Sequence, residues 1–312
     1  MLMKRAVIFY LLFSLTLYAQ AAVQYAFMPE NPLPGEPVTI GVNVGSGVMS
    51  AALVVNGRRL ARTVFFLVPA EGERQAFFAA VMAIPSTARP GSAVIVLESI
   101  LQDDGSRETM AEISLNIGMR EFASETIDLN PVLTGIRTDP SPQRTAEADH
   151  LWSILNRVGR QVYGLDTFIA PVTSTRRTSN FGSRRVFRYS DGSSDVSIHA
   201  GVDYGVPTGT VVRACAPGRV VLARNRIVTG NSVIIEHLPG IYSLYYHLDS
   251  IEVAENTVIS AGTQLGLSGA TGLATGPHLH WEIRVFGENT DPDAFIARPI
   301  LDKDALFGKL FP

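Results

Sequence analysis

The feature that most constrains the fold is a series of short apolar runs separated by turn-forming residues. Between Pro207 and Gly269, pairs such as Pro217-Gly218 and Ala261-Gly262 interrupt the chain, about once every ten residues. The intervening runs are rich in valine, isoleucine and tyrosine, and they carry no helical period. This pattern predicts an antiparallel β core.

A similar pattern predicts a separate β domain over residues 24–118. Val38 to Val44 alternate with smaller or polar residues, and Asn56-Gly57 lies between two strand-like runs as a strong hairpin signal. Asp104-Gly105 separates two further runs. We expect an immunoglobulin-like β-sandwich. It contains no histidine, so we expect a spacer or binding module, with a cover over the functional site as the sharper alternative.

Residues 119–165 read as a polar linker that ends in one amphipathic helix. Ser141-Pro142 is a helix start, with serine as the cap and proline in the first turn. The apolar positions recur three and four residues apart and end at Gly164; they are Ala148, Leu151, Leu155, Val158 and Val162. A third unit is expected over residues 166–300, followed by a C-terminal tail, 301–312.

Residues 1–21 have the pattern of a secretory signal peptide. Lys4 and Arg5 precede an apolar core, and Ala19-Gln20-Ala21 is a small-x-small cleavage site. The apolar core is shorter than a membrane span of about 20 residues, so we expect cleavage and no stable span afterwards. We therefore expect the protein to be exported to the periplasm or cell envelope. A net charge of −3 gives no electrostatic reason for a nucleic-acid partner.

Four of the six histidines fall in three strand-like patches. His278 and His280 begin an apolar run in which alternate side chains share a face. His199 and Asp203 are four residues apart and share a face if that stretch is also extended. His247 lies in a third β-prone run.

Imidazole and carboxylate groups together are a zinc ligand set. Zinc binds them tetrahedrally, and a catalytic site uses three protein ligands and leaves the fourth position to water. His199, Asp203 and His280 make such a set. His247 and His278 would then face the same place as proton-transfer groups. A single strand histidine is more often structural, so the prediction depends on the combination.

The patches resemble the lysostaphin-type, or LytM-like, zinc metallopeptidases of the M23 family, which cut the peptide part of peptidoglycan. The His-x-x-x-Asp and His-x-His motifs of that family are matched at 199–203 and 278–280, and its Tyr-x-His-like strand at 245–247. Its Phe-Gly-x-Arg element is matched at 181–184, which makes Arg184 a candidate substrate-binding residue. The resemblance covers roughly residues 170–298 and implies one zinc ion per chain, with His247 and His278 as catalytic residues.

The sequence therefore predicts a mainly β, exported zinc endopeptidase that acts on the cross-links or stem peptides of peptidoglycan. Two alternatives stay open. A cell-wall D,D-carboxypeptidase also uses a His/Asp/His zinc set, but it employs a glutamate base where this chain has histidines. A non-catalytic wall-binding scaffold, or an activator of other hydrolases, would not need the ligand positions that this chain retains.

Overall fold

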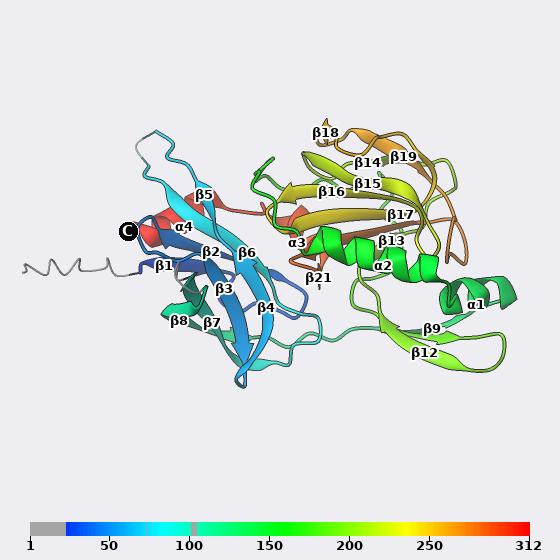
Figure 1. Cartoon of the computed structure of the whole chain (residues 1–312), viewed down its shortest axis with the longest axis horizontal. Helices are drawn as coiled ribbons and strands as arrows, with labels where there is room; N and C mark the ends of the chain where they lie inside the picture. Colours follow the sequence, from blue (N-terminus) through cyan, green and yellow to red (C-terminus); the bar gives the residue numbers. More distant parts are fainter. Residues whose placement is uncertain (1–22, 73, 101–104) are drawn as a thin grey trace, which may run out of the picture.

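The computed structural model describes residues 23–72, 74–100 and 105–312, and the chain is mainly β, as predicted (Figure 1). The predicted signal peptide, residues 1–21, lies outside these ranges. Within them, no helix has both the length and the apolar character that a membrane crossing requires.

In the described N-terminal part, eight strands form two antiparallel four-stranded sheets. The first has the order β1-β2-β6-β5, formed by Tyr25–Met28, Pro37–Asn43, Phe77–Ala83 and Phe66–Val68. The second has the order β4-β3-β7-β8, formed by Arg58–Val64, Ser50–Val55, Gly91–Ile100 and Arg107–Ile117. Immunoglobulin sandwiches have this arrangement apart from one added strand. The order supports the immunoglobulin-like assignment, which stays a prediction.

Local sequence explains the hairpins of this part. Asn56 and Gly57 both have positive φ, 49° and 74°, as a two-residue type I′ turn requires, and the predicted hairpin of β3 and β4 is confirmed. Strands β7 and β8 also pair as an antiparallel hairpin, although residues 101–104 of their turn are not described. The inward faces form an apolar core that includes Val38, Ile40 and Leu53.

The C-terminal part is built on a larger antiparallel sheet. Its main path has the order β10 (Arg177–Ser179), β13 (Val202–Tyr204), β20 (Leu279–Val285), β17 (Ile241–Ile251), β16 (Gly230–Leu238), β15 (Gly218–Arg226) and β18 (Val258–Ile259). Attached to this path are β14 (Val211–Arg213), β19 (Gln264–Ser268) and β21 (Glu288–Thr290). Strands β13, β17 and β21 all pair with β20, the strand that begins within the His-x-His motif, and β13 and β17 pair with it at His280.

The predicted linker contains more structure than its sequence indicates. Helix α1 (Pro131–Thr138) begins after the capping residue Asn130, and strand β9 (Ser124–Asp128) pairs in parallel with β11 (Arg184–Arg188). With β12 (Ser194–Ile198), these two strands form a small three-stranded sheet beside the large one.

A helix is present at the predicted place, but it is shorter than predicted and buries only its last two residues. Helix α2 (Pro142–Leu155) starts at the predicted cap Ser141 and packs Ile154 and Leu155 against the large sheet (Figure 1). It ends before Val158, which is exposed. Beyond the helix, Gly159 packs against Glu236, where an added Cβ would lie 2.1 Å from the carboxylate oxygen Oε1.

The predicted C-terminal tail folds back onto the N-terminal part. Helix α3 (Pro292–Ala297) leads to α4 (Lys303–Leu310), whose buried Leu306 and Leu310 lie against Gly41 of β2 (Figure 1). One continuous buried cluster joins this helix, the outer face of the first N-terminal sheet and the core of the large sheet. The two parts therefore share a hydrophobic core.

We expect Leu306→Ala to lower the free energy of unfolding by about 2–5 kcal/mol, because it removes a fully buried side chain and leaves a cavity between the two parts. Urea denaturation followed by circular dichroism measures this. Leu67→Ala is the matched control, since Leu67 is 52% exposed on β5 and its truncation should change stability by about 0.5 kcal/mol or less. Equal losses for the two variants would contradict the shared core.

Candidate metal centre and active site

Strand pairing places two of the predicted ligands directly opposite each other. Asp203 of β13 and His280 of β20 are cross-strand partners, and side chains at such positions have Cβ atoms about 4.5–5.5 Å apart. On the other side of β20, Tyr246 is the partner of His280, and its ring stacks on the imidazole with the two planes 3° apart. His280 is therefore held between two strands.

His199 reaches the same place by a different route from the one predicted. His199 and Asp203 do not lie on one continuous strand, because β12 ends at Ile198 and β13 begins at Val202. Residues 199–201 separate the two strands. At Gly201 the backbone lies so close to β20 that an added Cβ would be 2.1 Å from the Trp281 carbonyl oxygen. The sequence identified the convergence of His199 with Asp203 but not its cause.

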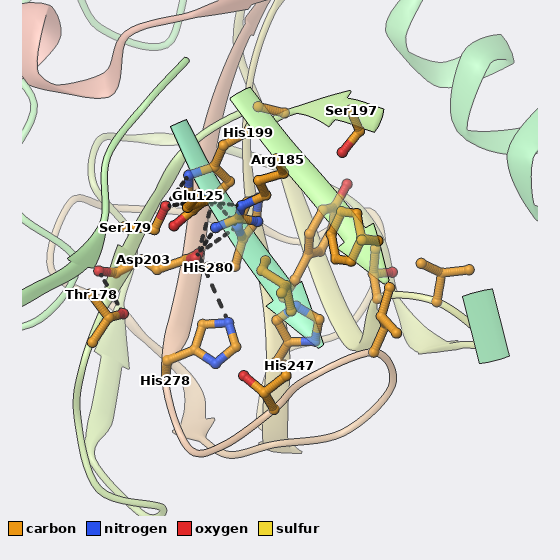
Figure 2. A pocket seen from close by; sticks show the side chains of 18 of the residues that line it. Glu125, Thr178, Ser179, Arg185, Ser197, His199, Asp203, His247, His278 and His280 are labelled. Atoms are coloured by element: carbon orange, nitrogen blue, oxygen red, sulfur yellow. Dashed lines mark hydrogen bonds and ion pairs between the residues drawn. The ribbon is translucent and has the colours of Figure 1, made fainter. Parts of the chain in front are cut away.

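Three donor atoms meet at this point (Figure 2). His199 Nε2 lies 3.1 Å from Asp203 Oδ1 and 3.0 Å from His280 Nδ1, and the last two atoms are 2.7 Å apart. The outer nitrogen of each ring donates to an acceptor: His199 Nδ1 to the Asn180 carbonyl at 2.8 Å, and His280 Nε2 to Glu282 Oε1 at 2.9 Å. These acceptors assign the tautomers and direct the inner lone pairs at one another.

The pKa values of His280, Asp203 and Glu282 show which charge this cluster of side chains favours. Burial alone would lower the pKa of His280, but the Asp203 and Glu282 carboxylates raise it to about 9. Burial would likewise raise the pKa of Asp203, yet the His280 and His199 rings hold it well below its usual range. Arg284 and His280 outweigh burial at Glu282 and bring its pKa to about 2. A positive charge is therefore favoured where the three donor atoms meet.

The three residues fit a divalent cation. In a tetrahedral site with bonds of about 2.0–2.1 Å, neighbouring ligand atoms are about 3.3 Å apart. The three separations here are 2.7–3.1 Å, so the side chains need to move outward by only a few tenths of an ångström. All three are buried, and each ring is already oriented by a partner on its outer nitrogen, as in protein metal sites.

His247 and His278 lie together beside this cluster (Figure 2). Their ring centroids are 4.8 Å apart, and His278 Nε2 is 3.8 Å from Asp203 Oδ1. Each ring donates from Nδ1 to a backbone carbonyl, of Thr271 at 2.7 Å and of Gly276 at 2.8 Å. Burial lowers the pKa of both rings, that of His247 to about 3. Both are therefore neutral near pH 7, with Nε2 available as a proton acceptor.

The histidines line a cavity of about 470 Å³. One wall is the loop around Gly276 together with the turn between β15 and β16, and the opposite wall is formed by β9, α1 and β11, with Ile127 and Phe187 among its apolar residues. None of the described residues before Glu125 lines the cavity, so the sandwich strands β1–β8 contribute nothing to its walls.

The arginine of the Phe-Gly-x-Arg element does not reach the cavity. Arg184 donates to the Ser86 carbonyl at 2.8 Å and lies over the Phe122 ring, so its position gives no support to a substrate-binding role. Arg185, on the opposite face of β11, lines the cavity and donates to Asp203 Oδ2 at 2.7 Å. Strand alternation is the signal that separates these two adjacent arginines.

Two further residues near the ligands were missed by the sequence reasoning. Ser179 Oγ lies 3.1 Å from His199 Nδ1 and donates to Glu125 Oε1 at 2.8 Å. Glu125 comes from β9, in the predicted linker. A serine and a glutamate without a motif carry no sequence signal, and only the parallel pairing of β9 with β11 brings Glu125 to this site.

Known proteins resemble the part of the chain that forms this site. Residues 197–292 match the family described as Peptidase family M23. The DD-carboxypeptidase/endopeptidase Mpg of Neisseria meningitidis serogroup B is 39% identical over 124 residues, which cover 40% of this chain and 28% of that protein. The peptidoglycan DD-endopeptidase ShyA of Vibrio cholerae serotype O1 is 42% identical over 118 residues, 38% of this chain and 27% of that protein. The chain thus spans less than a third of these relatives.

A solved structure resembles nearly the whole chain. A crystal structure from Pseudomonas aeruginosa assigned to peptidase M23 has a TM-score of 0.58 and 23% sequence identity, and it covers 85% of this chain and 94% of that one. This likeness shows a shared fold. The family match includes His199, Asp203, His247, His278 and His280. Residues 197–292 are therefore the part of the chain that is similar to M23 peptidases.

Proposed function

We propose that this protein is an exported zinc metalloendopeptidase that hydrolyses peptide bonds in peptidoglycan, at cross-links or in stem peptides. The observation that carries the proposal is the convergence of His199 Nε2, Asp203 Oδ1 and His280 Nδ1 beside two neutral imidazoles in an open cavity. Relatives named as peptidoglycan DD-endopeptidases support the substrate class.

Zinc is the proposed metal because of the donor set. Two imidazole nitrogens and one carboxylate oxygen suit zinc, and three protein ligands leave one position open, as in catalytic zinc sites. When bound, zinc supplies a Lewis acid that polarises a carbonyl group and lowers the pKa of a water molecule. His199, Asp203 and His280 would hold it, and Glu282 fixes the orientation of the His280 ring.

His247 and His278 are the proposed proton-transfer residues. Each holds its own ring proton on Nδ1, so Nε2 accepts a proton from the attacking water and then returns it to the leaving amine. A protonated ring also stabilises the negative charge that develops on the scissile carbonyl oxygen. The two rings have the same hydrogen-bond pattern, and we assign these tasks to the pair.

A carboxypeptidase with a glutamate base is disfavoured by the pairing of the glutamates. Among the described residues that line the cavity, the glutamates are Glu125 and Glu282. Glu125 accepts from Arg185 and Ser179, and Glu282 from His280 and Arg284. The Neisseria relative has both activities in its name. Mass spectrometry of products from purified sacculi separates them, since an endopeptidase converts cross-linked dimers to monomers and a carboxypeptidase releases D-alanine.

Export to the periplasm or cell envelope is part of the proposal, since that is where the substrate lies. It is supported by the signal-peptide pattern of residues 1–21 and by relatives named for peptidoglycan.

Replacing any one ligand should abolish metal binding and activity together. For His199→Ala, Asp203→Ala and His280→Ala we expect loss of bound zinc, because two protein ligands rarely retain a structural or catalytic zinc ion. Zinc content by atomic spectroscopy, measured beside muropeptide cleavage, tests this. His150→Ala is the control, because His150 is exposed on α2. A ligand variant that keeps full zinc content would overturn its assignment.

Replacing a proton-transfer histidine should preserve zinc and reduce turnover, by about 10²–10⁴-fold for a general acid–base residue. His247→Asn is the preferred variant, because His247 has a φ of +63° and asparagine tolerates that conformation better than alanine. His278→Ala is the companion variant. Single-turnover cleavage of a purified cross-linked muropeptide gives the rate. Full activity in His247→Asn would remove that residue from the chemistry.

A further inference from the structure

A carboxylate from outside the family match lies behind two of the three candidate ligands. Glu125 belongs to β9, which precedes the matched region by about seventy residues of chain. The parallel register of β9 and β11 makes Glu125 and Arg185 direct partners. Figure 2 shows Glu125 beside Arg185 and Ser179, on the far side of the donor cluster from His247.

Glu125 accepts hydrogen bonds from two side chains, and each of these side chains contacts one candidate ligand. Its Oε1 accepts from Ser179 Oγ at 2.8 Å and from Arg185 Nε at 2.5 Å. Ser179 Oγ, whose proton is used in that bond, lies 3.1 Å from His199 Nδ1 and accepts a share of the same ring N–H that donates to the Asn180 carbonyl at 2.8 Å. Arg185 Nη2 donates to Asp203 Oδ2 at 2.7 Å, which leaves Oδ1 for the cluster.

This arrangement balances the positive charge of Arg185 with the negative charge of Glu125. Arg185 is only 15% exposed, and its guanidinium contacts the carboxylate of a candidate ligand. An unbalanced cation there would draw electron density from Asp203 and repel a metal ion on Oδ1. Glu125 neutralises that charge while Arg185 still fixes the orientation of Asp203. Buried charges are tolerated when they are paired in this way.

We infer that Glu125 is a positioning residue of the metal centre, acting through Arg185 on Asp203 and through Ser179 on His199. The inference is built on the proposed function, since it takes His199, Asp203 and His280 as the ligands. The functional unit then begins at β9, upstream of residue 166, and the stretch that joins the two parts of the chain belongs to the active site.

The test is the zinc affinity of the full chain, measured by competition with a chromophoric chelator. Glu125→Gln keeps an oxygen acceptor for both donors and removes only the charge, so we expect the zinc Kd to rise about tenfold, and Glu125→Ala to raise it toward a hundredfold, as for other outer partners of metal ligands. The cobalt-substituted Glu125→Gln variant should also have altered visible absorption bands, which a change in general stability would not produce.

Asp128→Asn is the matched control. Asp128 lies on the same strand but on its exposed face, where it is 3.7 Å from Arg188, and its zinc Kd should stay within about twofold of the original, because surface charges act weakly at a distance. A loss equal to that of Glu125→Gln would overturn the inference. Ser179→Ala, which removes one of the two routes, provides a second reading and should raise the Kd by several-fold.

A double-mutant cycle tests the route through Arg185. If Glu125 acts chiefly by balancing that guanidinium, Glu125→Gln should change the zinc Kd much less when Arg185 is already glutamine. Equal changes in both backgrounds would overturn this route. Failure of the original protein to bind zinc or cleave muropeptides would overturn the proposed function. Normal binding and cleavage, with an unchanged Kd in Glu125→Gln, would overturn only the role of Glu125.

Discussion

The site depends on one unfavourable juxtaposition, three lone-pair donors held about 3 Å apart in a buried place. Strand register places Asp203 directly opposite His280. His199 reaches the same point because the extended chain is interrupted at Gly201. Such an arrangement is unstable without a positive charge between the donors. The raised pKa of His280 shows that a proton is attracted to that place, and a divalent cation satisfies all three donors at once.

The surrounding structure serves to keep ring protons away from the place where the donors meet. Backbone carbonyls or carboxylates accept from the outer nitrogen of all four histidines, which are His199, His247, His278 and His280. Backbone acceptors cannot be removed by substitution and do not titrate, so three of the four tautomers are set by the path of the chain. At His280 the acceptor is Glu282, two residues along the same strand face.

The sequence predicted the parts of the site that depend on local alternation. His278 and His280 both line the cavity, as a period of two requires, and Asn56-Gly57 forms the predicted hairpin turn. The sequence could not predict the contacts that depend on strand pairing between distant parts of the chain. Two adjacent arginines on β11 point to opposite faces, so the choice between Arg184 and Arg185 needed the face of the strand to be known. Glu125 needed a parallel pairing across about sixty residues of chain.

The contact between the two parts explains how the N-terminal sandwich relates to a cavity that it does not line. The turn at Phe181-Gly182 presses on Gly35 of the sandwich and on Phe122, and Gly182 donates its backbone N–H to the His199 carbonyl at 2.9 Å. Both contacts between an aromatic ring and a glycine are tight, because an added Cβ at Gly35 or Gly182 would lie within 2.3 Å of an aromatic carbon. The sandwich therefore supports the turn that is hydrogen-bonded to the backbone of the candidate ligand His199. The hydrophobic core that the sandwich shares with α4 keeps it in that position.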